Sequence, residues 1–405
     1  MLPVDEAEKR ILQLIQPLQA QETIPLASAG DRILAQTVTS QLDFPYWDNS
    51  AMDGYAVKFE DVQHCHRDQP CRLKIIEEIP AGYCPQQKIE SGDSARIFTG
   101  GMLPEGADTV VMQEQTQRDG DKVMILTPPK LKQAFVRQKG TYYQKGNPLL
   151  KPGVRITAAE IAILATAQLS EIEVFPAPKV GILSTGDELV LPDQVLRPGQ
   201  IVDSNQFALA TAVATTGGMP QRLGIVPDDP QQLRQKIAQA IATSDMVLST
   251  GGVSVGDYDY IDQILAELGG EIHIRSVAIK PGKPLTVASF ANGCVYFGIP
   301  GNPVSALVSW WRFVKPALLK LSGLNQGWLP RFIGARTAHD LRSGGKRETY
   351  LWGRVESDRN EFSLAGGSHS SGNLINLAQT NALARIPVGQ TLIPAGDQTQ
   401  VMLLS

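Results

Sequence analysis

The chain has 405 residues, of which 42% are hydrophobic and 19% are charged, and its formal net charge is −4. At roughly 150 residues per domain, this length favours two to four domains over a single core. The slightly acidic balance provides no global positive field that would recruit nucleic acid or an acidic membrane surface. We therefore expect no nucleic-acid partner and no membrane partner, and any anionic ligand must be held by local groups.

The N-terminal segment predicts an amphipathic helix. Charged residues between positions 5 and 10 precede the apolar residues Ile11, Leu12, Leu14 and Ile15, and this pattern lacks the apolar core of a signal peptide. No run in the chain reaches the roughly 18 apolar residues of a membrane span. We expect a cytoplasmic protein.

The cysteines favour neither a disulfide framework nor a zinc site. Cys65, Cys71, Cys84 and Cys294 are few and unevenly placed for a chain of this length. His64 and His66 flank Cys65, but no Cys-x-x-Cys pair accompanies them. We expect ordinary loop and core cysteines.

Residues from about 55 to 127 predict a small β-rich domain. Short strands at 109–112 and 122–126 are broken by Gly and Pro and show little helical periodicity. A helical stretch at 158–167 follows and links this domain to the next.

Residues 179–323 alternate short β-branched runs with helical stretches. This spacing predicts a parallel sheet covered on both faces, with ligands at the carboxyl ends of the strands. We expect strands at 180–183, 223–226, 246–248 and 295–299, and helices at 205–216, 233–242, 261–265 and 303–321. Beyond residue 331, apolar runs at 351–355, 382–386 and 400–404 predict a compact β-barrel or sheet.

Three loops that follow strands of the α/β region carry groups suited to anions or metals. They are 184–188, with a hydroxyl and two carboxylates, 249–259, with Gly251 and Gly252 before two acids, and 300–306. Backbone N–H groups without side chains favour an oxyanion, whereas the acids suit a metal. Each loop alone is also compatible with an ordinary turn. Because all three end strands at one edge of the sheet, a ligand site is the favoured interpretation.

Three other segments carry clustered charges. Lys280-Pro281-Gly282-Lys283-Pro284 places two ammonium groups on a stiff turn, which suits one anion, although a solvated loop is the alternative. Residues 48–55 place two carboxylates beside a glycine, where a turn is the default interpretation. The sequence Asp228-Asp229-Pro230 is compatible with the N-cap of the following helix.

Five motifs occur in one order along the chain: Asp48-Asn49-Ser50-Ala51-Met52-Asp53-Gly54-Tyr55-Ala56-Val57, Ser184-Thr185-Gly186-Asp187-Glu188-Leu189, Thr250-Gly251-Gly252-Val253-Ser254-Val255-Gly256-Asp257, Lys280-Pro281-Gly282-Lys283-Pro284 and Pro300-Gly301-Asn302-Pro303-Val304-Ser305-Ala306. Together they closely resemble the molybdopterin molybdenumtransferase family, the bacterial MoeA proteins and the related gephyrin E domain. The resemblance spans nearly the whole chain and is weakest after Arg331.

This resemblance implies a fold of α/β and β domains. The expected parts are a central doubly wound α/β domain of the molybdopterin-binding type, a β-rich N-terminal insertion domain and a C-terminal β-barrel domain. The expected bounds are 1–46 with 139–176 for an elongated linker domain, 47–138 for the β-rich domain, 177–325 for the α/β domain and 326–405 for the barrel. A homodimer is also implied, in which Asp53 faces the α/β loops of the partner chain.

The implied enzyme takes adenylylated molybdopterin and molybdate as substrates, inserts molybdenum at the dithiolene and releases AMP in a Mg²⁺-dependent step. An upstream adenylyltransferase and downstream molybdoenzymes are the implied protein partners. Two other functions remain open, a molybdopterin-binding scaffold or carrier and an adenylyltransferase acting on molybdopterin.

The resemblance also implies roles for individual residues. Its functional acids correspond to Asp53, Glu188, Asp228 and Asp259, and the metal ligands would be Glu188, Asp228, Asp257 and Asp259. The implied substrate-binding residues are Ser50, Thr185, Gly186, Gly251, Gly252, Ser254, Lys280, Lys283, Pro300, Asn302, Ser305, Arg347 and Ser371. One departure is notable: the family commonly has Gly-Glu-Asp after Val136-Arg137, whereas this chain has Gly140-Thr141-Tyr142, which removes both carboxylates.

Overall fold

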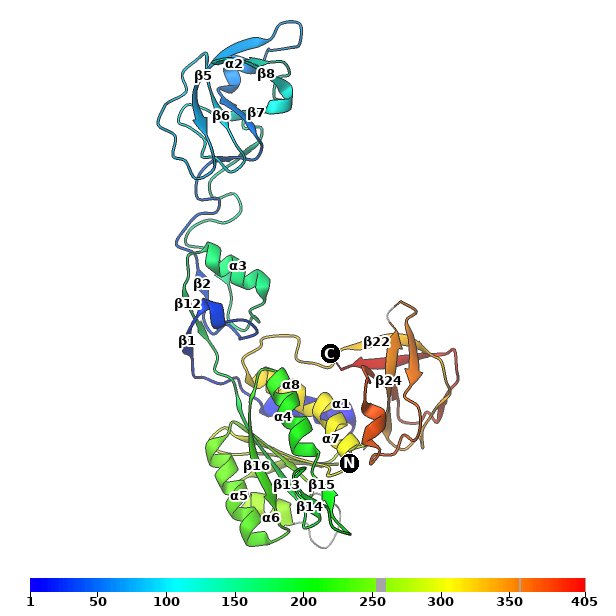
Figure 1. The fold of residues 1–405 in the computed structure, drawn as a ribbon. Coiled ribbons are helices and arrows are strands. Elements are labelled where there is room, and N and C mark those ends of the chain that lie inside the picture. Colours follow the sequence, from blue (N-terminus) through cyan, green and yellow to red (C-terminus); the bar gives the residue numbers. More distant parts are fainter. Residues whose placement is uncertain (253–259, 357, 405) are drawn as a thin grey trace. The chain divides into compact units, whose positions relative to one another are not determined.

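The computed structural model describes residues 1–252, 260–356 and 358–404. The chain divides into two compact units (Figure 1). The β-rich unit comprises Thr37–Lys151 with Thr166–Gln168, and the main unit comprises Met1–Gln36, Pro152–Ala165 and Leu169–Ser405. Among the described residues, no helix is both long enough and apolar enough to cross a membrane.

The β-rich unit contains a six-stranded sheet, which confirms the predicted β-rich domain. Its strand order is β7 (Thr109–Met112), β4 (Gly54–Val57), β6 (Asp93–Ile97), β5 (Cys71–Ile79), β9 (Lys122–Ile125) and β8 (Thr116–Asp119). Strand β4 is buried along its whole length because it lies between β6 and β7. Two short ladders continue the unit, β2 (Val38–Thr39) with β11 (Pro148–Leu150) and β3 (Asn49–Ser50) with β10 (Val136–Arg137).

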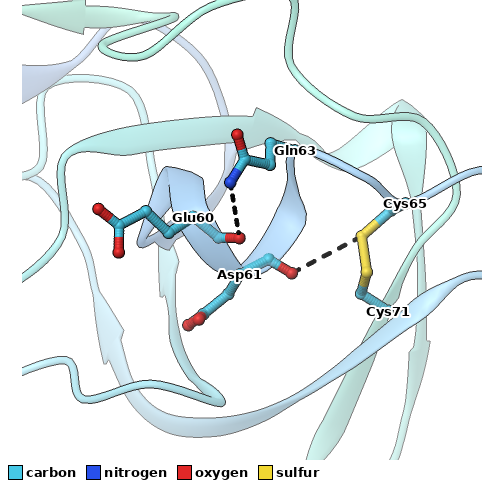
Figure 2. The surroundings of a disulfide bond; sticks show 5 residues. All are labelled: Glu60, Asp61, Gln63, Cys65 and Cys71. Carbon is cyan, nitrogen blue, oxygen red and sulfur yellow. Dashed lines mark hydrogen bonds between the residues drawn. A yellow bond between two sulfur atoms is a disulfide. The ribbon is translucent and has the colours of Figure 1, made fainter.

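The expectation of ordinary cysteines is wrong for Cys65 and Cys71, which form a disulfide (Figure 2). Cys65 follows the short helix α2 (Phe59–Val62), and its sulfur lies 3.9 Å from the main-chain oxygen of Asp61. A local bridge between His66 and Gln69 turns the chain back, so Cys71 at the start of β5 comes within 5.4 Å of Cys65, measured between Cα atoms. A single pair closing a short loop has no pattern that distinguishes it from two isolated cysteines. Cys84 and Cys294 are free.

The α/β part of the main unit is built on one six-stranded sheet. Its strand order is β16 (Met219–Val226), β13 (Lys179–Thr185), β17 (Met246–Thr250), β21 (Val295–Ile299), β20 (Pro284–Ser289) and β18 (Glu271–Ser276). The first four strands are parallel, as predicted, but β20 runs antiparallel to both of its neighbours. A tight turn around Gly293 joins β20 to β21, and a connection this short permits only antiparallel pairing.

Helices cover both faces of this sheet, which confirms the doubly wound prediction. One core cluster contains residues of α5 (Pro230–Thr243) and α6 (Tyr260–Glu267), and another contains residues of α1 (Val4–Leu14), α4 (Asn205–Thr215), α7 (Pro303–Ser309) and α8 (Lys315–Leu321) (Figure 1). The predicted long helix at 303–321 is interrupted by a π turn at Trp310–Val314. Helix α5 begins as predicted, because the side chain of Asp229 accepts a hydrogen bond from the main-chain nitrogen of Gln232 at 2.8 Å.

The C-terminal strands close into a barrel, as expected. The closed ring is β24 (Glu348–Glu356), β25 (Glu361–Leu364), β22 (Phe332–Thr337), β28 (Gln398–Leu403) and β26 (Ala382–Ile386), which returns to β24. Strand β19 (Ile279–Lys280) pairs with β24 and joins the barrel to the α/β part. The remaining elements are β1 (Glu22–Pro25), β12 (Glu171–Val174), β14 (Leu189–Val190), β15 (Ile201–Val202), β23 (Leu341–Arg342), β27 (Leu392–Ile393), the helix α3 (Ala158–Thr166) and 3-10 turns at Leu26–Ser28, Gln113–Gln115 and Leu374–Leu377.

Arg312 in the π turn connects three parts of the main unit. Its side chain is 3% exposed and contacts the carboxylates of Glu8 and, at 3.3 Å, Asp5 on α1. Its Nε donates to the hydroxyl of Tyr350 at 3.1 Å, and that hydroxyl donates to Glu348 at 2.7 Å. A buried charge needs such partners, because an unpaired one would lose its hydration without compensation.

We expect Arg312→Met to lower the free energy of unfolding by about 3–5 kcal/mol, because it leaves Glu8 without its buried cation and the Tyr350 hydroxyl without its donor. Urea denaturation measures this change. Arg10→Gln is the matched control, since Arg10 forms an exposed ion pair with Glu6 on the same helix α1 and should cost less than about 1 kcal/mol. Equal losses of unfolding free energy for the two substitutions would show that the buried contacts of Arg312 stabilise the protein no more than an exposed ion pair does.

Candidate functional site

A cavity of about 790 Å³ lies where β13, β17 and β21 end. Its lining includes all three loops predicted to hold a ligand. Predicted site residues that line it are Thr185, Gly186, Glu188, Asp228, Gly251, Gly252, Pro300, Asn302 and Ser305. The carboxyl ends of parallel strands thus meet at one place, as the sequence pattern required.

The loop after β17 approaches the loop after β13 so closely that it requires glycine. Gly251 and Gly252 have φ angles of 88° and 65°, a region that side chains disfavour. A Cβ atom on Gly251 would lie 2.4 Å from the main-chain oxygen of Thr185. The glycines therefore allow two strand ends to share one wall of the cavity.

Thr185 presents an unused hydroxyl at this wall. The residue is 4% exposed, and its Oγ1 has no hydrogen-bond partner among the residues that the structure describes. By contrast, the neighbouring Ser184 hydroxyl is 2.8 Å from that of Thr250 and is satisfied. Buried polar atoms are normally hydrogen-bonded, so the Thr185 hydroxyl fits a polar ligand atom in the cavity.

The third loop holds the opposite wall. Helix α7 begins at Pro303, where a missing N–H costs no helical hydrogen bond. The main-chain oxygen of Gly301 accepts a hydrogen bond from the side chain of Asn205 at 2.7 Å, which ties the loop to the start of α4. Ser305, on the first turn of α7, is buried and lines the cavity.

Acidic groups cluster on one side of the cavity. Asp187, Glu188 and Asp228 line it, and the main-chain nitrogen of Asp228 donates to Asp187 at 3.2 Å. Partial burial, followed by the negative charges of Asp187 and Glu188, raises the pKa of Asp228. Within the described ranges, no group of three His, Cys, Asp or Glu side chains could hold a metal ion. The arrangement fits Mg²⁺, which often takes one or two protein carboxylates together with phosphate oxygens.

Sequence reasoning missed Asp203, which is 2% exposed and also lines the cavity. Its carboxylate accepts hydrogen bonds from the main-chain nitrogens of Asn205 and Gln206 and, at 2.6 Å, from the Gln206 side chain. In the sequence, Asp203 is distinguished only by its position just before the predicted helix at 205–216, which is typical of a helix-capping residue. In the structure, its carboxylate does bind the first main-chain N–H groups of α4.

Four other predicted residues in the described part of the main unit do not line this cavity. Lys280 lies on β19, Lys283 lies in the loop before β20, and Arg347 donates to the main-chain oxygen of Ile279 at 3.2 Å. The main-chain oxygen of Ser371 accepts from Val304 on α7 at 3.3 Å. These four residues lie near the junction of barrel and α/β sheet, and Pro284 is the part of the lysine loop that reaches the cavity.

Asp53 and Ser50 belong to the β-rich unit. The main-chain nitrogen and the hydroxyl of Thr99 donate to the Asp53 carboxylate at 2.8 and 2.7 Å, and these hydrogen bonds lower the pKa of Asp53. The hydroxyl of Ser50 is used within its own turn, where it bonds to the main chain of Met52. The predicted residues Ser254, Asp257 and Asp259 lie outside the described residues.

We expect Gly251→Ala to destabilise the protein by at least about 1 kcal/mol more than Gly224→Ala in urea denaturation. Both glycines have φ near 88°, so both substitutions introduce similar backbone strain. Only Gly251 would also bring a Cβ atom against the main chain, because the space beside Gly224 is open. Equal losses would show that the contact with Thr185 does not require glycine.

We also expect Asp228→Asn to raise the free energy of unfolding at pH 7 in the absence of divalent cations. Because the folded state raises the pKa of Asp228, ionisation of this group destabilises the folded state at neutral pH, and the gain should fade as the pH falls through that raised pKa. Urea denaturation between pH 7 and pH 4 checks this trend. Asp193→Asn, at an exposed position outside the cavity lining, removes the same charge; a pH-dependent gain there of equal size would refute the explanation.

Comparison with known proteins relates this geometry to a family. Residues 2–167 match the model of the MoeA N-terminal region (domain I and II), residues 181–320 match that of a probable molybdopterin binding domain, and residues 334–404 match that of the MoeA C-terminal region (domain IV). The chain is 54% identical over 411 residues to a molybdopterin molybdenumtransferase of a Nostoc species, covering 100% of this chain and 94% of the relative. A molybdopterin molybdenumtransferase of Bacillus subtilis is 32% identical, with coverage of 100% and 94%.

A solved structure agrees with these sequence matches. The crystal structure of the molybdopterin biosynthesis MoeA protein from Pyrococcus horikoshii superposes with a TM-score of 0.86 at 29% identity, over 100% of both chains. The resemblance drawn from the five sequence motifs is therefore confirmed, and the chain belongs to the MoeA family of molybdopterin molybdenumtransferases, the transferases of molybdenum cofactor biosynthesis.

Proposed function

We propose that this chain inserts molybdenum from molybdate into adenylylated molybdopterin, releases AMP and forms the molybdenum cofactor. The observation that carries this proposal is the strand-end cavity. Gly251 and Gly252, here called the glycine cradle, line it together with the Thr185 hydroxyl, which has no partner among the described residues. The acids Asp187, Glu188 and Asp228 line the same cavity. The oxygens of a phosphoanhydride need neutral hydrogen-bond donors, and its charge needs a cation. The cavity supplies the donors itself, and its acids would hold the cation.

The described residues would fall into a group that binds the substrate and a group that binds the metal. Main-chain N–H groups at Gly251 and Gly252 would position the phosphates and the pterin end of the substrate, together with the polar groups of Thr185, Asn302 and Ser305. Gly186 would only line the same wall, since its own N–H already donates to the main-chain oxygen of Val226 at 3.3 Å. Glu188 and Asp228, with Asp257 and Asp259, would hold Mg²⁺, which when bound neutralises charge on the scissile phosphoanhydride. Pro300 shapes the wall between these groups.

Lys280, Lys283, Arg347 and Ser371 would hold molybdate. Ammonium and guanidinium groups suit a tetrahedral oxyanion, and Arg347 is already fixed beside β19 by its hydrogen bond to Ile279. An oxygen of molybdate or of water would attack the phosphorus of the adenylyl group, and the phosphoanhydride bond to the molybdopterin phosphate would break. Attack by water would release AMP directly, whereas attack by molybdate would form an adenylyl-molybdate anhydride that water then hydrolyses to AMP. The dithiolene sulfurs would displace oxygen from molybdate, and that oxygen would leave as water. Ser254 would contribute a further hydroxyl to the substrate.

The proposed assembly is a cytoplasmic homodimer with the domain bounds expected above. Asp53, held ionised by Thr99, would act together with Ser50 at the cavity of the partner chain. An adenylyltransferase would supply the substrate, and apo-molybdoenzymes would receive the product.

The decisive assay is AMP release from purified adenylylated molybdopterin with Mg²⁺, with and without molybdate. We expect molybdate-dependent release, reduced at least about tenfold by Thr185→Val, because that substitution removes one hydroxyl donor and keeps the shape of the side chain. Thr243→Val is the matched control: Thr243 caps its own helix α5 by bonding to Gln239, and its loss should leave the rate unchanged.

Other outcomes of this assay separate the alternatives. Tight substrate binding without AMP release would indicate a scaffold or carrier, and ATP consumption with adenylyl transfer would indicate the preceding enzyme. Mixing inactive Asp53→Ala and Asp228→Ala protomers tests the shared site, since a heterodimer retains one intact pair of acids. No recovery of activity in verified heterodimers would contradict it.

A further inference from the structure

The main unit has a second cavity of about 500 Å³. Among the described residues, none lines both this cavity and the proposed catalytic cavity. Its walls come from the end of α4, from the π turn and α8, from the segment 327–331 and from the end of β28. Pockets of this size commonly accept small organic ligands.

The second cavity is lined by cations that lack a strong internal counter-charge. Arg155, Lys315 and Arg331 line it, and no Asp or Glu lies among the lining residues that the structure describes. Arg155 is 3.9 Å from Asp31, whose side chain is 85% exposed, so this ion pair is weak. The ammonium of Lys315 donates to the main-chain oxygen of Leu404 at 3.4 Å.

Lys315 is partly buried and shares this cavity with a second cation, Arg155. Burial, followed by the positive charge of Arg155, lowers the pKa of Lys315. The two side chains therefore repel each other inside a partly enclosed space. An anion between them would remove that repulsion and supply hydrogen-bond acceptors.

The same cavity contains two indole rings. Trp311 and Trp328 line it together with the apolar side chains of Leu319, Leu329 and Leu403. Tryptophan offers a flat, polarisable face on which another ring can stack. The combination of two indoles with three cations is selective for a ligand that has both a ring and a negative charge.

We propose that this second cavity is a binding site for a small aromatic phosphate, with the phosphate held by Arg155, Lys315 and Arg331 and the ring held against Trp311 and Trp328. A phosphate has enough oxygens to engage all three cations, whereas a carboxylate can occupy one guanidinium fork. This inference does not depend on the proposed catalytic function.

The test uses full-length protein labelled with 5-fluorotryptophan and the probe phenyl phosphate. The chain has five tryptophans, and Trp311→Phe and Trp328→Phe assign the two fluorine signals of the cavity. We expect these two signals to shift on titration with phenyl phosphate and to stay in place with phenol or inorganic phosphate at the same concentrations. Lys315→Gln should raise the dissociation constant at least about tenfold, as expected for loss of one charge-assisted hydrogen bond.

Arg331→Gln, at an exposed position, should also weaken binding and provides a second variant that is expected to fold. Lys236→Gln on α5, outside the cavity lining, should leave the dissociation constant unchanged. Absence of a shift at millimolar phenyl phosphate, or equal binding by Lys315→Gln, would overturn the proposal.

Discussion

The buried guanidinium of Arg312 is the contact on which the arrangement of the main unit depends. It lies in the π turn between α7 and α8 and binds carboxylates of α1 on one side and the hydroxyl of Tyr350 in β24 on the other. Tyr350 donates to Glu348, whose main-chain nitrogen donates to Ala278 at 2.9 Å. The main-chain nitrogen of Ala278 then donates to Leu2 at 2.8 Å, just before α1, so the contacts close into a circuit.

This circuit fixes groups that lie well away from Arg312 in sequence. Because Glu348 is paired with Ile279 in the β19–β24 ladder, it determines where Lys280 and Arg347 lie relative to α7. The same helix carries Ser305 into the strand-end cavity. Arg312 lies within the π turn, an irregularity that often occurs where a helix positions a functionally or structurally important side chain.

The sequence predicted those features that depend on local pattern. Apolar runs such as 246–248 and 295–299 identified the central strands, and their glycine- and proline-containing ends identified the cavity. It could not predict features that depend on distant partners. The buried pairing of Arg312 with Glu8 joins segments 304 residues apart, whose proximity has no periodic signal. The antiparallel β20 and the Cys65–Cys71 disulfide, although local, were also missed, because each depends on a short turn and not on a periodic pattern. The motif of Lys280 and Lys283 indicated an anion site. It could not indicate that this site lies apart from Gly251 and Gly252, because that depends on how the barrel packs on the α/β sheet.

The charges of the strand-end cavity restrict how the proposed substrate can enter it. Partial burial, followed by the charges of Asp187 and Glu188, raises the pKa of Asp228. The same three acids line this side of the cavity, so phosphate groups arriving alone would be repelled from it. The cradle residues and Thr185 supply only neutral donors, which orient phosphates without cancelling their charge. On the proposed function, a divalent cation held by Glu188 and Asp228 would neutralise this charge. The cations at the barrel junction would then remain available for the second, separate anion, molybdate.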